Sequence, residues 1–170
     1  MTGVRVTIDD KQLRQALAAL ARIGRDPAPA LRALGPLLVS STRDRITRER
    51  APDGAAWPRL NPAYAAAKRG PGILRERAMR GGLFASLTSQ VEGNVLRVGT
   101  NKVYAAIHQF GGTIRPRAAP RLAFRLGQRL VFAGKVTIPA RPFLGISDDD
   151  RATILEVFED FAARATQARR

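Results

Sequence analysis

Apolar and polar positions along the N-terminal part of the chain predict one strand followed by two helices. Residues 3–9 alternate apolar with polar side chains, which is the period of a half-buried strand. Leucine and isoleucine at helical spacing then predict a helix that ends at Gly24 and a longer helix from Pro27 to about Arg50. Pro36 is expected to kink this second helix or to mark a late start, because proline lacks a backbone donor.

Residues 51–82 break this pattern. Their prolines and glycines are Pro52, Gly54, Pro58, Pro62, Gly70, Pro71, Gly72, Gly81 and Gly82. Only Asn61–Arg69 favours a short helix. About thirty irregular residues in a compact domain indicate a functional or assembly loop. Trp57, the single tryptophan, is expected to anchor this loop on the chain's own core or, less commonly, in a pocket of a partner.

Short elements dominate the second half of the chain. They are a helical turn over 83–87, a hairpin over 90–100, a helix over 103–110, a hairpin over 122–132 and a strand over 136–138. Gly93-Asn94 and Gly127-Gln128 supply two-residue turns for the hairpins. Val103, Ile107 and Phe110 share one side of the helix, which is expected to end at Gly111-Gly112.

The last predicted helix spans residues 147–168. Ser147 and Asp150 have the spacing of a capping box, in which each side chain accepts from the other's backbone N–H. One apolar stripe follows, made of Ile154, Phe158, Phe161 and Ala165. The elements together predict a single α+β domain over 1–170, with helices packed on a small, mainly antiparallel sheet and a long irregular loop.

The chain carries a large excess of positive charge. It has 29 Lys and Arg residues, 25 of them Arg, against 14 Asp and Glu, and its net charge is +15. A genome with arginine-biased codons would account for the choice of Arg over Lys, but not for the excess itself. The excess indicates a polyanion or an acidic protein surface nearby. No acidic residue lies between Glu92 and Asp148.

Five arginines of this acid-free interval, which we call the basic ladder, are Arg115, Arg117, Arg121, Arg125 and Arg129. Strand residues two or four apart share a face, so Arg115 with Arg117, and Arg121 with Arg125, are candidate phosphate-contacting pairs. No known DNA- or RNA-reading motif accompanies them, so sequence-specific recognition is not expected. Three interpretations of the basic ladder remain open: it contacts a DNA backbone, it contacts an acidic partner, or it is a solvated loop without a ligand.

Residue types that support catalysis are scarce. The only histidine, His108, is interpreted as a packed residue with a local hydrogen bond, and no second His or Cys exists to complete a zinc site. Asp148, Asp149 and Asp150 are consecutive, so they radiate around a helix start and suit capping rather than metal binding. No glycine segment has the spacing that holds nucleotide phosphates. The sequence predicts no enzyme, no metal and no cofactor.

The composition also limits the compartment. The chain has no cysteine, so disulfides are absent and a reducing cytoplasm is permitted. Residues 1–10 are polar and do not resemble a secretory signal. Apolar runs are short and interrupted, so no membrane-spanning segment is expected.

Four blocks of residues resemble the phage virion morphogenesis family, the tail-completion proteins of Mu-like temperate phages and related prophages. The blocks cover residues 30–165 in the family's order. The first block is Arg48 to Gly54, with Pro52 and Asp53, followed by Trp57, and the second is Ile73-Leu74 followed by Gly82-Leu83 and Ser86-Leu87. The third block is Val98 to Thr100 followed by Tyr104 to Gly112, with His108 and Gly111. The fourth block is Ile138 to Gly145, with Pro139, Arg141, Pro142 and Phe143. A longer insert before Leu83, bearing Arg and Gly, departs from the family's pattern.

The resemblance implies a non-enzymatic structural protein at the head–tail junction or the tail end. It is expected to form a ring of sixfold symmetry in the virion after assembly in the host cytoplasm. Its partners would be other copies of itself and other phage neck, connector or tail proteins, with non-specific contact to DNA in the ring lumen. No membrane partner is implied.

The resemblance also suggests roles for the motif residues. Pro139 and Pro142 would rigidify a turn that presents Arg141 and Phe143. Arg141 would form a bidentate salt bridge within the subunit or to a neighbour. Tyr104 and His108, four residues apart on a helix, would hydrogen-bond the adjoining loop. Packing within the subunit and direct interface contact both remain open for these residues.

Three functional hypotheses follow. The first is a head-to-tail ring whose subunits meet through the 51–82 loop and the hairpin region. The second is a stand-alone, non-specific nucleic-acid-binding protein that uses the basic ladder. The third is a small hydrolase or toxin built around His108.

Overall fold

The computed structural model describes residues 21, 24, 26–68, 70–75 and 82–167. Its helices are α2 (Ala28–Arg48), α3 (Pro62–Ala67), α4 (Ala105–Phe110) and α5 (Asp148–Gln167). Its strands are β1 (Thr88–Glu92), β2 (Val95–Gly99), β3 (Gly112–Ile114), β4 (Leu122–Leu126), β5 (Arg129–Ala133) and β6 (Val136–Ile138). This confirms the α+β class. The predicted strand at 3–9 and nearly all of the first predicted helix lie outside the described residues.

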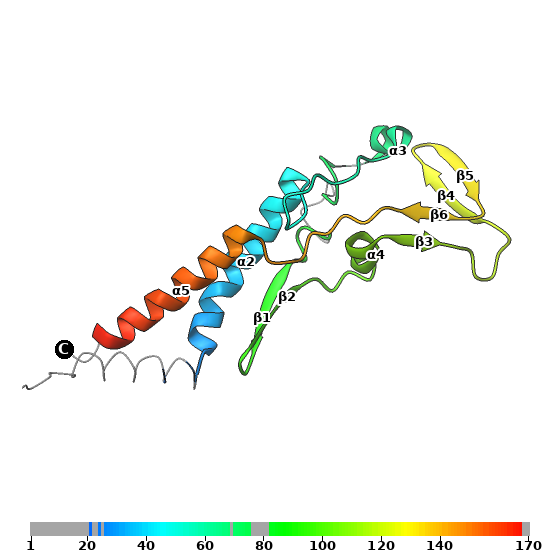
Figure 1. The fold of residues 1–170 in the computed structure, drawn as a ribbon. Helices are drawn as coiled ribbons and strands as arrows, with labels where there is room; N and C mark the ends of the chain where they lie inside the picture. The colour runs from blue at the N-terminus through cyan, green and yellow to red at the C-terminus, as the bar shows by residue number, and fades with distance from the viewer. Residues whose placement is uncertain (1–20, 22–23, 25, 69, 76–81, 168–170) are drawn as a thin grey trace, which may run out of the picture.

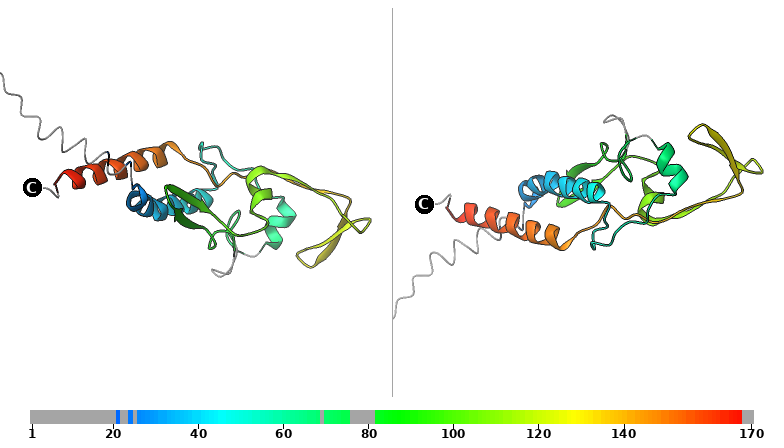
Figure 2. Two further views of the ribbon diagram at one scale, coloured as in Figure 1. Left: turned by 90° about the horizontal axis from the view of Figure 1, so that it is seen from below. Right: turned by 90° about the horizontal axis from the view of Figure 1, so that it is seen from above.

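The molecule is elongated, with its two long helices at one end and a hairpin at the other. α2 and α5 lie side by side, and the β4–β5 hairpin stands at the opposite end (Figure 1). The two views of Figure 2 show the same separation between α5 and this hairpin. The elements in between connect the helical end to the hairpin end.

Helix α2 is the central element of the helical end. Its buried positions recur at helical spacing and include Ala30, Leu34, Leu38, Thr42 and Ile46. Pro36 lies inside the helix at an exposed position, which excludes the late start, one of the two alternatives expected for it. The helix ends where Glu49 adopts a left-handed conformation, with φ of 55°. Basic residues in its last turn favour this end through the helix dipole.

The strands of the described ranges form three separate two-stranded antiparallel sheets rather than one small sheet. The β1–β2 hairpin packs on α2, and its turn lies at Gly93-Asn94 as predicted. Gly35 of α2 permits this packing, because a Cβ there would lie 2.5 Å from the Ser89 hydroxyl. The inward positions Leu96 and Val98 alternate with exposed Val95 and Arg97.

Strands β3 and β6 form a ladder that carries the second hairpin. Gly112 pairs with Ile138 and Ile114 with Val136, so β3 and β6 lead to and from the β4–β5 hairpin (Figure 1). The hairpin's turn at Gly127-Gln128 is confirmed, with φ of 64° at Gly127. β3 was not predicted. The predicted helix over 83–87 is a single turn at 83–86.

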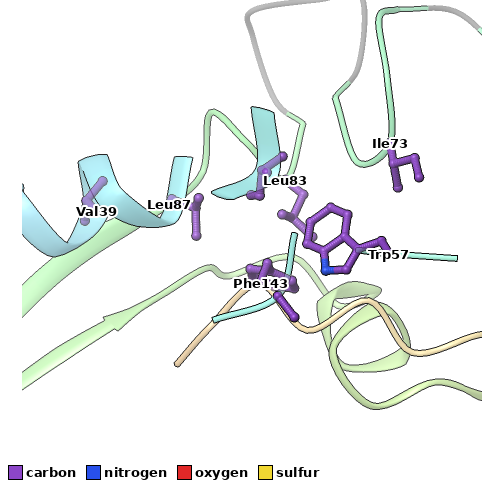
Figure 3. Close-up of a cluster of buried hydrophobic side chains, with 8 residues drawn as sticks. Val39, Trp57, Ile73, Leu83, Leu87 and Phe143 are labelled. Carbon is purple, nitrogen blue, oxygen red and sulfur yellow. The ribbon is translucent and has the colours of Figure 1, made fainter. Parts of the chain in front are cut away.

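A hydrophobic cluster lies where the motif segments meet the end of α2 (Figure 3). Its fully or nearly fully buried members are Val39, Ile46, Ala51, Trp57, Ile73, Leu83, Leu87 and Phe143. They come from α2, the 51–82 segment, the turn before β1 and the segment before α5. Packing of residues so far apart in sequence is what holds these irregular segments in place.

The C-terminal helix has the predicted cap. The Asp150 backbone N–H donates to the Ser147 hydroxyl at 3.1 Å, and the Ser147 N–H donates to the Asp150 carboxylate at 2.9 Å. Ile154, Phe158 and Phe161 are half-buried, and α5 contacts α2. The side chain of Ala165 lies outside the described residues, as do Arg169 and Arg170.

Candidate assembly interface

Trp57 holds the irregular loop on the chain's own core. Its indole is buried in the hydrophobic cluster, and its Nε1 donates to the Pro142 carbonyl at 2.9 Å. Its backbone N–H donates to the Glu49 carbonyl at 2.9 Å, and the Glu49 carboxylate accepts from the Ile73 N–H at 2.7 Å. The interpretation of Trp57 as an anchor on the subunit's own core is confirmed.

The Pro-Asp-Gly segment is a closed turn. The Asp53 carboxylate accepts from the Ala55 N–H at 3.0 Å, and Gly54 has φ of 83°. Pro52 packs on Gly145, where a Cβ would lie 2.6 Å from the Pro52 Cγ. The turn therefore joins the loop to the segment before α5.

Arg141 is buried and is satisfied by backbone carbonyls. Its Nε donates to the Pro58 carbonyl at 2.9 Å and its Nη2 to the Arg59 carbonyl at 3.2 Å. Among the described residues no carboxylate forms the expected salt bridge with this guanidinium, and a salt bridge to a neighbouring subunit stays a prediction. Burial lowers the pKa of Arg141, an effect that the Glu49 charge opposes. Arg141 thus holds the Pro58-Arg59 part of the loop through hydrogen bonds made within the subunit.

Gln109, which sequence reasoning did not single out, clamps the segment after Arg141. Its Oε1 accepts from the N–H groups of Phe143 and Leu144, each at 3.0 Å. Its Nε2 donates to the Leu144 carbonyl at 2.9 Å. Phe143 is completely buried beside it. The only signal of this role in the sequence was a glutamine on the inward side of a short helix.

His108 packs in the same region, and the expected local hydrogen bond is not made by its Nδ1 atom among the described residues. Its ring meets the Tyr104 ring edge-on at 6.1 Å between centroids, and the Nδ1 atom is buried without a partner in the described part of the chain. The His108 backbone carbonyl accepts from the Arg141 N–H at 2.7 Å. Burial, and then the charge of Arg141, lower the pKa of the imidazole below its ordinary value of 6.5.

A small recess of about 80 Å³ lies beside His108. Tyr64, Lys68 and Arg141 contribute to its lining, and none of the described lining residues is Asp, Glu, Ser or Thr. Groups of three or more His, Asp or Glu residues that could hold a metal ion are absent from the residues described here.

Gly111 and the prolines complete the motif region. Gly111 ends α4 with φ of 71°, and a Cβ there would lie 2.7 Å from the Ala140 nitrogen. This close approach lets α4 lie directly against the segment from Pro139 to Pro142. The motif residues therefore pack and fix loops inside the subunit.

A buried ion pair, also missed by sequence reasoning, joins the two long helices. Arg45 of α2 contacts Asp150 of α5 at 2.6 Å. Arg45 also donates to the hydroxyls of Ser41 and Thr42 and to the Gly145 carbonyl. Burial raises the pKa of Asp150. Hydrogen bonds from Ser41, Ser147 and Arg45 outweigh that effect and hold the pKa below its ordinary value.

The basic ladder points outward. All five of its arginines are exposed, and none forms an ion pair within the described ranges. Arg97, by contrast, pairs with Glu92 across the first hairpin. Arg115 and Arg117 lie in the segment after β3, Arg121 directly precedes β4, and the last two lie on the β4–β5 hairpin.

Large apolar side chains are exposed near the ladder. Leu130 and Phe132 of β5 are 53% and 58% exposed. Val103, which precedes α4, is 97% exposed, and Phe110, the last residue of α4, is 78% exposed. The predicted apolar side of that helix is therefore open to solvent except at half-buried Ile107. Uncovered apolar groups of this size indicate a contact surface.

None of the helices within the described ranges has both the length and the apolar character to cross a bilayer.

Comparison with known proteins agrees with these motifs. Putative capsid assembly protein G of Escherichia phage Mu is 30% identical to the chain over 170 residues, which cover 98% of this chain and 97% of that protein. Mu-like prophage FluMu G protein 2 of Haemophilus influenzae is 31% identical over 159 residues, which cover 93% and 95%. No solved structure matches the chain. Residues 8–161 match the phage virion morphogenesis family, and the chain therefore belongs to that family.

Proposed function

We propose that this chain is a non-enzymatic structural protein that completes the phage tail or joins head to tail. It acts as a head-to-tail ring of sixfold symmetry in the virion, after assembly in the host cytoplasm. Its neighbours are other neck, connector or tail proteins of the phage. The phage Mu relative is named a putative capsid assembly protein, which agrees with a role in assembly.

The observation that carries this proposal is the contrast between motif residues and exposed residues. Trp57, Arg141 and Phe143 are used inside the subunit, where they fix its irregular loops. The exposed hairpin end carries arginines without carboxylate partners in the described part of the chain, together with uncovered apolar side chains. A rigid scaffold with an unsatisfied surface suits a protein that binds other proteins.

The 51–82 segment contributes an outer surface of its own. Its first part is tied to the core through Trp57, whereas α3 has no buried residue and Tyr64 is 46% exposed. α3 lies beside the second hairpin in Figure 1 and contacts β4. We propose that contacts with other subunits and with partner proteins are made by α3 and the β4–β5 hairpin, the two elements at this end of the molecule.

A non-enzymatic role fits the chemistry around His108. Its imidazole is buried beside Tyr104, and the lining residues that the structure describes offer no carboxylate and no Ser or Thr hydroxyl. An enzyme of the hydrolase type needs a positioned base next to a nucleophile. The environment of His108 favours a packing role.

The ring is tested with the purified full-length chain. Mass photometry and native mass spectrometry over a range of concentrations should show a closed multimer of six subunits. Deletion of the gene from an inducible prophage should leave heads and tails unjoined or tails without an end, and expression in trans should restore joined particles. Normal particles without the protein would contradict the role.

A second candidate function, stand-alone binding to nucleic acid, has one observation in its favour, namely the exposed basic ladder. It predicts that the unassembled chain binds duplex DNA of any sequence with an affinity that falls steeply with salt. Arg115→Ala with Arg117→Ala should reduce both affinity and salt slope. In the ring, the same pair would meet DNA in the lumen only weakly, because tight binding would retain the genome.

A further inference from the structure

We propose that the outward face of the β4–β5 hairpin of one copy docks on the outward face of α5 of a second copy. This contact joins neighbouring subunits in addition to any contact made by α3, and the inference rests on the proposed ring. Four observations carry it: the uncovered hairpin face, the acidic and apolar stripe on α5, their complementary character and their positions at opposite ends of the molecule.

The hairpin has one half-buried face and one uncovered face. Phe124 pairs with Val131 and Arg125 with Leu130, so alternate pairs face opposite sides. The more buried face holds half-buried Leu122, Leu126, Val131 and Ala133, together with exposed Phe124 and Arg129. The uncovered face holds Ala123, Arg125, Leu130 and Phe132, and Arg121 extends it.

Such a hairpin needs further contact to be stable. A two-stranded hairpin by itself is marginal in water. α3 contacts β4, and a Cβ at Gly127 would lie 3.2 Å from the Ala67 Cβ. The side with Arg125, Leu130 and Phe132 has no covering element among the described residues.

Helix α5 presents a surface of opposite charge. The side with Ile154, Phe158 and Phe161 is half-buried, and α5 packs on α2. The outer side carries exposed residues three or four positions apart, which form one stripe: Asp148, Ala152, Leu155, Glu156 and Glu159. Leu155, in the centre of this stripe, is 64% exposed.

Carboxylates are concentrated on this helix. Of the 14 Asp and Glu residues of the chain, six lie in residues 148–160. Asp150 forms the buried ion pair with Arg45, and the other five acidic residues are exposed. Glu156 and Glu159 form no ion pair in the described part of the chain. The protein itself thus contains an acidic surface that matches the hairpin's arginines.

The apolar side chains favour a protein occupant over DNA. Leu130 and Phe132 lie among Arg121 and Arg125, and a phosphate backbone offers no apolar surface to cover them. Leu155 supplies such a surface among carboxylates. Interfaces between proteins commonly join an apolar centre to a charged rim. The occupant is therefore a second copy of this chain.

The two faces lie at opposite ends of the subunit (Figures 1 and 2). A subunit cannot bring its own hairpin to its own α5 stripe. The contact is heterologous: the hairpin of each copy meets the helix of the next. Repetition of such a contact closes into a ring when the rotation between neighbours fits.

Cross-linking tests this contact, and the absence of cysteine from the chain makes the test clean. Leu130→Cys and Leu155→Cys variants of the full-length chain are mixed and treated with a short bismaleimide. A covalent dimer should form in the mixture and not with either variant alone. Val103→Cys, at an exposed site on neither face, replaces Leu130→Cys in the control mixture. No more dimer than in that control would overturn the inference.

Charge exchange provides the second test, by native mass spectrometry and sedimentation. Arg121→Glu with Arg125→Glu should raise the dissociation constant of subunits about tenfold or more, since it places like charges together. Glu156→Arg with Glu159→Arg should weaken assembly likewise, and the four changes combined should restore it. Arg115→Glu with Arg117→Glu makes the same change in net charge outside both faces and should leave assembly intact.

The outcomes separate this inference from the proposed ring. Multimers that survive both the hairpin and the helix reversals would overturn this contact and leave the ring. Loss of random-sequence duplex DNA binding in the hairpin variant, with unchanged assembly, would assign the face to DNA and overturn the inference. A wild-type chain that stays monomeric without cross-links would overturn both.

Discussion

Trp57 and Pro142 are joined by a hydrogen bond of 2.9 Å from the indole Nε1 to the proline carbonyl. The bond connects the irregular loop after α2 to the segment before α5, 85 residues along the chain. Arg141, next to Pro142, holds the same loop through two further carbonyls. The first and the fourth of the blocks that resemble the family thus form one internal unit, whose stability can be tested residue by residue.

Removal of the indole should destabilise the protein strongly. Trp57→Ala is expected to lower the free energy of unfolding by about 3–5 kcal/mol, because it removes a large buried side chain and leaves a cavity. Trp57→Phe keeps most of the apolar contact but leaves the Pro142 carbonyl without its donor, at a cost of about 1–3 kcal/mol. Urea denaturation measures both. A loss for Trp57→Ala no larger than that for Trp57→Phe would contradict the anchor role.

The Gln109 clamp is expected to depend mainly on its acceptor. Gln109→Leu leaves the N–H groups of Phe143 and Leu144 unsatisfied and should cost about 1–3 kcal/mol for each buried group. Gln109→Glu keeps an acceptor for both N–H groups, but it loses the donor to the Leu144 carbonyl and places a second carboxylate oxygen beside it. The glutamate variant should therefore unfold at higher denaturant concentration. The reverse order would show that the amide does not hold this segment.

The Arg45–Asp150 ion pair should stabilise the folded protein at neutral pH and lose this effect in acid. Asp150→Asn leaves Arg45 buried without its counter-charge, which is expected to cost about 3–5 kcal/mol at pH 7. The folded-state pKa of Asp150 is depressed, so its contribution is present above the unfolded pKa and is lost as the pH falls through the folded pKa. The difference between wild type and variant should shrink toward low pH.

Asp148→Asn is the matched control for this comparison. Asp148 lies in the same turn but is fully exposed, and it contacts Arg151 at only 3.7 Å. An exposed pair of this kind contributes little to stability. Equal losses for Asp148→Asn and Asp150→Asn would contradict the importance of the buried pair.

His108 should make the protein less stable in mild acid. Its folded-state pKa is lowered, so the unfolded chain takes up a proton near pH 6.5 while the folded chain remains neutral. The free energy of unfolding therefore falls as the pH drops from about 6.5 toward the folded pKa. His108→Phe keeps a ring against Tyr104 and should remove this part of the pH dependence. An unchanged slope between pH 5 and pH 7 in the variant would exclude His108 as its source.

The sequence predicts the elements that local rules define. The helices follow from apolar spacing, and both hairpins follow from glycine at a two-residue turn. The cap of α5 follows from Ser147 and Asp150 alone. These features need no knowledge of the rest of the fold.

Features that depend on distant contacts were missed or misjudged. β3 has three residues, begins with Gly112 and pairs with residues about 24 positions away, so no local pattern reveals it. The acceptors of Arg141 are carbonyls more than 80 residues away, which sequence cannot show. Gln109 and Arg45 look like ordinary helix residues until their partners are placed beside them. The outward position of the basic ladder, by contrast, agrees with its lack of acidic neighbours.

The mass of the assembled protein tests the central claim most directly. Native mass spectrometry of the full-length 18.5 kDa chain, from low to high concentration, should show a closed multimer of six copies. The Arg121→Glu, Arg125→Glu variant should shift that population to single subunits under the same conditions. A wild-type chain that remains a single subunit at every concentration would contradict the account.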